Sequence, residues 1–155
     1  MKRINVIRKI MKNITDELVI CSTGMVSREV YESRDRPENF YVMGSMGASL
    51  GIGLGLALHT DKKVVVLAGD GDILMSMGTL GLMNKLKLPN LRLVILDNNC
   101  YSSTGCQKTC SDAVDFTKIA NCEVYKVDAE KGPAGRVNIS HKDLAERFYN
   151  AVNNS

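Results

Sequence analysis

Along the chain, short apolar runs rich in β-branched residues alternate with longer segments in which apolar positions recur every three or four residues. The first pattern is typical of buried strands and the second of amphipathic helices. Strands are predicted over Leu18–Cys21, Phe40–Met43, Val64–Ala68, Leu91–Leu96, Glu123–Val127 and Val137–Ile139. Helices are predicted over Ile4–Ile14, Arg28–Ser33, Ala48–Leu58, Ile73–Leu86, Asp112–Asn121 and His141–Val152. This alternation predicts one three-layer α/β/α domain over residues 1–155, doubly wound around a mainly parallel sheet.

The polar residues of the predicted helices indicate which faces are solvated and where helices begin. In the first helix, Ile7 and Ile10 belong to an apolar face, and the basic residues, Arg3 among them, fall on other faces that we expect to meet solvent. Ser27 precedes the second helix and Ser140 the last one. Serine is favoured at both positions because its hydroxyl accepts a bond from a free backbone N–H.

Glycines recur at every fourth position at the start of the third predicted helix, at Gly47, Gly51 and Gly55. One helix face therefore carries almost no side chain, although each interior glycine costs up to ~1 kcal/mol relative to alanine. Close approach of the sheet or of a ligand is the usual compensation. The run does not fit the dinucleotide-binding fingerprint, because Leu56 stands at the position of its last glycine.

Two polar clusters end neighbouring strands in the middle of the chain. Gly69-Asp70-Gly71 follows the third predicted strand, and Asp97-Asn98-Asn99 follows the fourth. One helix and one return strand separate them, the minimum for a parallel crossover, so both clusters lie where open α/β sheets bind ligands. Asp70, Asn98 and the backbone carbonyl of Cys100 offer the hard oxygen ligands that magnesium prefers, with phosphates completing its shell.

Composition narrows the classes of function. The formal net charge of +3 is small and its basic residues are dispersed, which gives little support to nucleic-acid binding. The apolar run Ala48–Leu58 is too short and glycine-rich to span a membrane, and Lys and Arg interrupt Met1–Ile14, so no signal peptide is predicted. The five cysteines form neither a short secreted framework nor a common zinc or iron–sulfur motif. We expect reduced thiols in a cytoplasmic protein.

The spacing of the central motifs is similar to that of a known family. G69-D70-G71 with N98-N99 after twenty-six residues resembles the thiamine-diphosphate motif, and G44-S45-M46-G47 resembles the glycine turn of the same enzymes. The resemblance implies thiamine diphosphate and Mg²⁺ as cofactors, with Asp70, Asn98 and the Cys100 carbonyl as metal ligands. It also implies that the Gly44 carbonyl and Met46 hold the pyrimidine ring.

Within that family, S22-T23-G24 with S27-R28-E29 and the stretch from Asp97 to Thr109 resemble sulfopyruvate and phosphonopyruvate decarboxylases, which act on 2-oxo acids with an anionic tail. The cofactor-binding residues implied are Thr23, Gly44, Ser45, Met46, Gly69, Asp70, Gly71, Asp72, Asn98, Cys100 and Tyr101. Hydroxyls and cations suit a sulfonate or phosphonate, so the substrate candidates are Arg28, Ser102, Ser103, Thr104, Gln107 and Lys108. Cys106 departs from the family, which carries glycine there.

The short length resembles the beta subunits of two-subunit sulfopyruvate decarboxylases. In the family, the glutamate that activates the cofactor belongs to a separate pyrimidine-binding domain. The resemblance therefore implies a hetero-oligomer in which an alpha subunit supplies this glutamate, and no catalytic residue in this chain. Two alternatives stay open: a 2-oxoacid:ferredoxin oxidoreductase beta chain, which Asp72 and the loop at Thr104–Gln107 also resemble, and a metabolite-binding module without catalysis.

Overall fold

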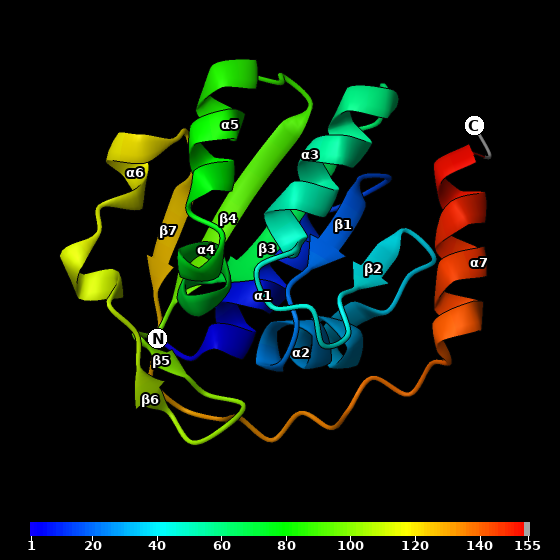
Figure 1. Cartoon of the computed structure of the whole chain (residues 1–155). Helices are drawn as coiled ribbons and strands as arrows, with labels where there is room; N and C mark the ends of the chain where they lie inside the picture. The colour runs from blue at the N-terminus through cyan, green and yellow to red at the C-terminus, as the bar shows by residue number, and fades with distance from the viewer. Residues whose placement is uncertain (154–155) are drawn as a thin grey trace.

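The computed structural model of the chain describes residues 1–153, which form a parallel sheet flanked by helices (Figure 1). The sheet strands are β1 (Leu18–Cys21), β2 (Asn39–Tyr41), β3 (Val64–Gly69), β4 (Leu91–Asp97) and β7 (Glu123–Lys126), and β5 (Cys100–Tyr101) and β6 (Gln107–Lys108) form a separate hairpin. The helices are α1 (Arg3–Lys12), α2 (Met25–Arg34), α3 (Ser49–His59), α4 (Asp70–Met75), α5 (Gly78–Leu86), the 3-10 turn η1 (Ser111–Ala113), α6 (Phe116–Ile119) and α7 (His141–Asn153).

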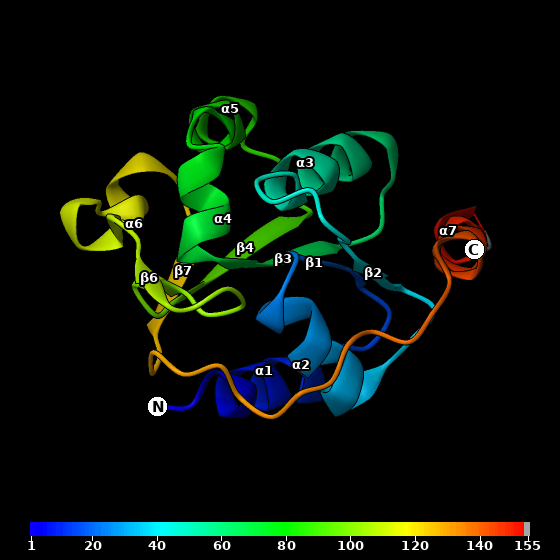
Figure 2. The ribbon, with the colours of Figure 1, turned by 60° about the horizontal axis from the view of Figure 1, so that its bottom comes forward.

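The strands are parallel and follow the order β2-β1-β3-β4-β7. Helices α1 and α2 cover one face, α3 to α6 cover the other, and α7 lies beside the β2 edge (Figure 2). The predicted three-layer α/β/α class is confirmed. The chain moves outward in one direction from β1 to β2 and in the other from β3 to β7, so the order reverses between β1 and β3. A crevice at the carboxyl ends of strands is expected at this switch point.

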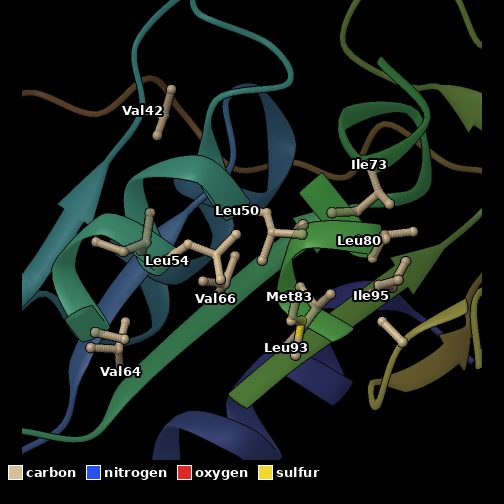
Figure 3. Close-up of a cluster of buried hydrophobic side chains, with 14 of the residues drawn as sticks. Val42, Leu50, Leu54, Val64, Val66, Ile73, Leu80, Met83, Leu93 and Ile95 are labelled. Atoms are coloured by element: carbon tan, nitrogen blue, oxygen red, sulfur yellow. The ribbon is translucent and has the colours of Figure 1, made fainter. Parts of the chain in front are cut away.

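Alternate residues of the central strands point to opposite faces, which builds a core on each side. Val64 and Val66 pack with Leu54 of α3 in one buried cluster (Figure 3). Val65 and Leu67 pack with α1 and α2 in the other. Because β3 is buried on both faces, its sequence is a continuous apolar run.

The helix predicted over Ile73–Leu86 is in fact two helices, and this prediction is wrong in both its start and its continuity. Helix α4 begins at Asp70, and Ser76 leaves the helical conformation with φ −135°. Its backbone N–H bonds to the carbonyl of Ile73, and the Thr79 hydroxyl donates to the Ser76 carbonyl at 2.6 Å. Serine and threonine hydroxyls that bond to backbone groups compete with the helix ladder.

Several other boundaries differ from the prediction, by one or two residues at elements such as α1 (Arg3–Lys12) and β7 (Glu123–Lys126) and by more at others. The segment Asp112–Asn121 contains only η1 and α6, because Asp115 caps α6 by accepting from the N–H of Thr117 at 3.2 Å. Helix α2 begins at Met25, before Ser27, whose hydroxyl donates instead to the Ser22 carbonyl at 2.7 Å. Strand β2 runs over Asn39–Tyr41, one residue earlier at its start than predicted.

Val137–Ile139 is not a strand. It belongs to an irregular connection, residues 127–140, which carries the chain from β7 to α7 at the opposite edge of the sheet (Figures 1 and 2). Val137 and Ile139 are half-buried against the α1–α2 core and obtain their burial without pairing to a strand. The predicted cap at Ser140 is present, since its hydroxyl accepts from the N–H of Asp143 at 3.1 Å.

The helical glycines divide between two environments. A Cβ on Gly53 would stand 2.3 Å from Val66 Cγ2, so this glycine lets α3 pack directly on β3. The expected close approach does not occur at Gly51 and Gly55, where a Cβ would meet open space within the described chain. Residues 1–153 include no helix with the length and apolar character needed to cross a membrane.

Candidate functional site

Three oxygen atoms converge where β3 and β4 end. The side-chain oxygen of Asn98 lies 2.8 Å from the backbone oxygen of Cys100 and 3.0 Å from Asp70 Oδ1. All three are acceptors, so none of them can hydrogen-bond to another, although the N–H of Cys100 donates to the Asn98 side-chain oxygen at 3.3 Å. Rotating the Asn98 amide by 180° would let its NH₂ group donate to the other two oxygens. A cation between the oxygens would stabilise the arrangement as it stands.

These distances fit magnesium. An octahedral ion with oxygen ligands at ~2.0–2.1 Å separates adjacent ligands by about 2.9 Å. The residues present therefore suit Mg²⁺ in donor type and spacing, and they leave coordination positions for phosphate oxygens. The predicted convergence of Asp70 and Asn98 is thus seen in the fold, with the Cys100 carbonyl beside them.

The electrostatic environment of Asp70 also favours a cation. Asp70 is 1% exposed, and burial raises the pKa of its carboxyl above the ordinary value. A hydrogen bond from the Thr109 hydroxyl to Oδ2 opposes this, and the negative charge of Asp97 adds to it. Asp97 itself is held by Lys126 and by the Ser111 hydroxyl. A buried carboxylate with a raised pKa gains most from a positive ion at bonding distance.

Asp72 connects the central motif to the glycine turn. Its Oδ1 accepts from the N–H of Gly47 at 2.8 Å, and its Oδ2 accepts from the Ser49 hydroxyl. Burial raises the pKa of Asp72, and these two hydrogen bonds oppose the rise. Gly47 has φ 93°, in the left-handed region that glycine tolerates. Asp72 thus fixes the Gly44–Gly47 turn against α4.

Gly71 allows two side chains to close over the site. A Cβ at Gly71 would stand 2.4 Å from Tyr101 Cε1 and 3.2 Å from Met46 Cε. The Tyr101 ring and the Met46 side chain therefore meet the backbone of α4 where only glycine fits. Met46 remains 37% exposed, so it forms the outer wall of the site.

These groups line one cavity of about 50 Å³, well below the roughly 300–1,000 Å³ of pockets that enclose a drug-sized ligand. Predicted residues that line it are Thr23, Met46, Gly69, Asp70, Gly71, Asp72, Asn98, Cys100, Tyr101, Ser102 and Ser103. Gly44 is adjacent, because its N–H donates to the Thr23 hydroxyl at 3.2 Å. On this chain alone the cavity has room for an ion or a phosphate group.

Other predicted residues lie outside the cavity lining. Ser45 is exposed on the turn, and Arg28 is half-buried on α2. Thr104, Gln107 and Lys108 are exposed on the β5–β6 hairpin, where the Thr104 hydroxyl donates to Gln107 Oε1 at 2.9 Å. Their assignment to substrate stays a prediction.

Arg3 lines the cavity although its helical position predicts a solvated residue. It is 4% exposed and forms a two-bond ion pair with Glu29, which is 2% exposed. The expectation of a solvated Arg3 is wrong, because Glu29 of α2 compensates its charge inside the protein. No periodic pattern could reveal this, since the two residues lie on different helices.

Cys100 and Cys106 form a disulfide across the hairpin, with their Cα atoms 4.8 Å apart. The expectation of reduced thiols is therefore wrong for this pair. Cys106 has φ 57° and its N–H donates to the Tyr101 carbonyl at 3.1 Å, so the turn folds back onto Cys100. Cys21, Cys110 and Cys122 are free.

The fold and the site define an α/β domain with oxygen ligands that converge at the carboxyl edge of its parallel sheet. The model of the family "Thiamine pyrophosphate enzyme, C-terminal TPP binding domain" matches residues 20–154. The chain belongs to this thiamine pyrophosphate enzyme family.

Curated relatives are similar over most of this chain. "Sulfopyruvate decarboxylase subunit beta" of Methanothermobacter thermautotrophicus is 46% identical over 127 residues, which are 82% of this chain and 69% of that protein. The subunit of the same name from Methanocaldococcus jannaschii is 48% identical over 70% of this chain and 58% of its own length. "Phosphonopyruvate decarboxylase" of Streptomyces viridochromogenes is 43% identical over 72% of this chain, and the match covers 28% of that enzyme.

Among solved structures, a thiamin diphosphate-dependent enzyme from Mycobacterium smegmatis, described as putative, matches 98% of this chain and 29% of its own with a TM-score of 0.61. The sequence identity is 21%, so this likeness concerns the fold alone.

Proposed function

We propose that this chain is the thiamine-diphosphate-binding beta subunit of a decarboxylase that acts on a 2-oxo acid with an anionic tail, with sulfopyruvate as the preferred substrate. The observation that carries the proposal is the convergence of Asp70 Oδ1, the Asn98 oxygen and the Cys100 carbonyl at 2.8–3.0 Å. The similarity to sulfopyruvate decarboxylase beta subunits supports the substrate class.

In this proposal, Asp70, Asn98 and the Cys100 carbonyl would hold Mg²⁺ together with the diphosphate of the cofactor. Bound thiamine diphosphate supplies the electron sink that decarboxylation of a 2-oxo acid requires. Tyr101 and Met46 close over the backbone at Gly71 and shield the cofactor from water. In this proposal, these residues of the chain bind the cofactor and orient it.

The activating carboxylate comes from an alpha subunit in this proposal. No glutamate lines the cavity within residues 1–153, and the aspartates there are engaged as described above. Exposed apolar side chains also lie at the outer side of the site, Met46 in its wall and Met75 beside Gly47. Such a surface is typical of one that another subunit covers.

Phosphonopyruvate is the second candidate substrate, because a phosphonopyruvate decarboxylase is 43% identical to this chain. Sulfonate and phosphonate are both tetrahedral anions, so the same hydroxyls and cations suit either. The candidates for this contact are Arg28, Ser102, Ser103, Thr104, Gln107 and Lys108.

The test is to purify the chain with its native partner and to measure carbon dioxide release from sulfopyruvate and phosphonopyruvate, with thiamine diphosphate and Mg²⁺ present. We expect faster turnover of sulfopyruvate, and loss of activity when the metal is removed by a chelator. Turnover of neither acid would contradict the proposed activity. Stoichiometric iron in the complex would favour the oxidoreductase alternative instead.

A further inference from the structure

The amide of Asn98 needs a second partner if its oxygen binds a cation. Its NH₂ group then points away from the ion into the protein, where Asn98 is 8% exposed. A buried amide donor requires an acceptor. In the structure this acceptor is the Ser102 hydroxyl oxygen, which receives the Asn98 NH₂ group. Ser102 is itself 9% exposed.

Ser102 is held in turn by the buried ion pair between α1 and α2. Arg3 Nε and Nη2 donate to the Glu29 carboxylate at 3.0 and 2.9 Å, and Nη1 donates to Ser102 Oγ at 3.4 Å. Arg3 Nη2 also donates to the backbone oxygen of Glu130 at 3.3 Å. One guanidinium therefore connects two helices, the hairpin loop and the connection that follows β7.

The bound cation would give this chain of bonds its direction, because a serine hydroxyl that accepts from Arg3 can either accept from the Asn98 NH₂ group or donate to the Asn98 oxygen. Arginine is always a donor, and a serine oxygen accepts up to two bonds while its hydrogen donates one. Ser102 can accept from Arg3 and from the Asn98 NH₂ group, while its own hydrogen faces Cys100 Sγ at 3.6 Å. With this set of bonds, the Asn98 oxygen faces Asp70 Oδ1 and the Cys100 carbonyl.

We propose that Ser102, held by the buried Arg3–Glu29 ion pair, is a positioning residue that orients the Asn98 amide so that its oxygen faces the divalent cation. The proposal rests on the proposed magnesium site and assigns Ser102 a role beside the metal instead of one at the substrate. Partners that orient metal ligands typically change metal affinity by about 10- to 100-fold when they are removed.

The test measures binding of Mn²⁺, as a probe for Mg²⁺, to the full chain with thiamine diphosphate present, by the electron paramagnetic resonance signal of free Mn²⁺. We expect Ser102→Ala to raise the Kd for Mn²⁺ by about 10- to 100-fold and Ser102→Thr, which restores a hydroxyl, to recover most of the affinity. The matched control is Ser33→Ala on α2, because the Ser33 hydroxyl is also buried but has no hydrogen-bond partner within the described residues. We expect it to bind Mn²⁺ like the wild type.

The role of the Arg3–Glu29 ion pair is tested with Arg3→Lys, which keeps the positive charge but lacks the planar guanidinium group. We expect a smaller rise in the Kd, about 3- to 10-fold, with the far-ultraviolet circular dichroism spectrum unchanged. If Arg3→Lys does not fold, the Kd of Ser102→Ala for Mn²⁺ still tests the proposal. Wild-type affinity in Ser102→Ala would overturn the proposal while leaving the metal site intact. Failure of the wild type to bind Mn²⁺ would overturn the metal site and the positioning role together.

Discussion

The diphosphate end and the pyrimidine end of the proposed cofactor site differ in how far this chain encloses them. Asp70 and Asn98 are 1% and 8% exposed, and their side chains contact Thr109 and Ser102. Met46 is 37% exposed, and Ser45 beside it also meets solvent. The difference indicates that this chain completes the ion-binding end by itself and leaves the ring-binding end for another surface to close.

The largest expected effect is at the diphosphate end of the site. Asp70→Ala removes the one charged ligand among the three protein oxygens proposed to bind the ion, and loss of one partner from a buried charge pair costs about 3–5 kcal/mol. We expect the Kd for Mg²⁺ with thiamine diphosphate, measured by calorimetry, to rise more than about 100-fold. Asp112→Ala, an exposed aspartate on η1, is the control. If Asp70→Ala bound Mg²⁺ as tightly as the wild type, the conclusion that this chain completes the ion-binding end would be wrong.

A smaller effect is expected from Gly71→Ala, which tests how tightly the diphosphate end is packed. The new methyl group would stand 2.4 Å from Tyr101 Cε1, and overpacking of this kind costs about 1–3 kcal/mol. We expect a melting temperature lower by about 2–12 °C, given about 2–4 °C per kcal/mol for a domain of this size. Gly81→Ala on α5, where a Cβ meets nothing within 4 Å, should not lower it. Equal melting temperatures of Gly71→Ala and Gly81→Ala would mean that the Tyr101 ring moves away from the new methyl group without cost.

Met46→Ala tests the pyrimidine end of the site. Because Met46 is part-exposed, we expect the free energy of unfolding of the isolated chain to change by less than about 0.5 kcal/mol. In the complex with the partner, we expect turnover to fall about tenfold, equivalent to about 1.4 kcal/mol, since this side chain would hold the pyrimidine ring of the cofactor. A large loss of stability in the isolated chain would show that the turn is as closed as the diphosphate end.

The smallest effect is expected away from both ends, where Arg147 of α7 makes two bonds to Asp35 at 2.9 and 2.7 Å. Burial acts to raise the pKa of Asp35, but the bonds from Arg147 and Tyr41 outweigh it and hold the pKa below 3.8. The folded state therefore binds fewer protons than the unfolded state, and the pair stabilises the fold above pH 3.8 and loses this as pH falls through the lowered pKa.

For a pair that is partly exposed, the contribution is at most about 1 kcal/mol. Urea unfolding of the wild type and of Asp35→Asn should differ at neutral pH and converge well below pH 3.8. Cofactor affinity should be the same in both proteins at neutral pH. A change in that affinity would mean that α7 influences the site and that the comparison of the two ends is incomplete.

The sequence predicts the convergence of Asp70 and Asn98 because this convergence follows from strand order. Once β3 and β4 are neighbouring parallel strands, the residues that follow them must meet, as Asp70 and Asn98 do. Arg3 could not be predicted, because its burial depends on Glu29, a partner that only tertiary packing identifies. Thr104, Gln107 and Lys108, which lie outside the cavity lining, come from a loop with no periodic pattern.

The errors in the fold have related causes. The apolar periodicity of residues 73–86 continues through the break at Ser76, which is made by hydroxyl bonds to the backbone. Val137–Ile139 has the alternation of a strand, but it satisfies that pattern by packing beside helices. In both places the local pattern reports burial correctly and misses the backbone geometry that achieves it.

The connection of residues 127–140 has a consequence for how the protein is made. It delivers α7 to β2, where Phe148 meets Phe40 with ring centroids 5.1 Å apart. During translation, β2 emerges about a hundred residues before α7, so its outer edge stays uncovered while most of the sheet is already available to fold. An unpaired strand edge is a template for association with other chains. The β2 edge is therefore open to neighbouring chains on the polysome until α7 has been synthesised and packs beside it.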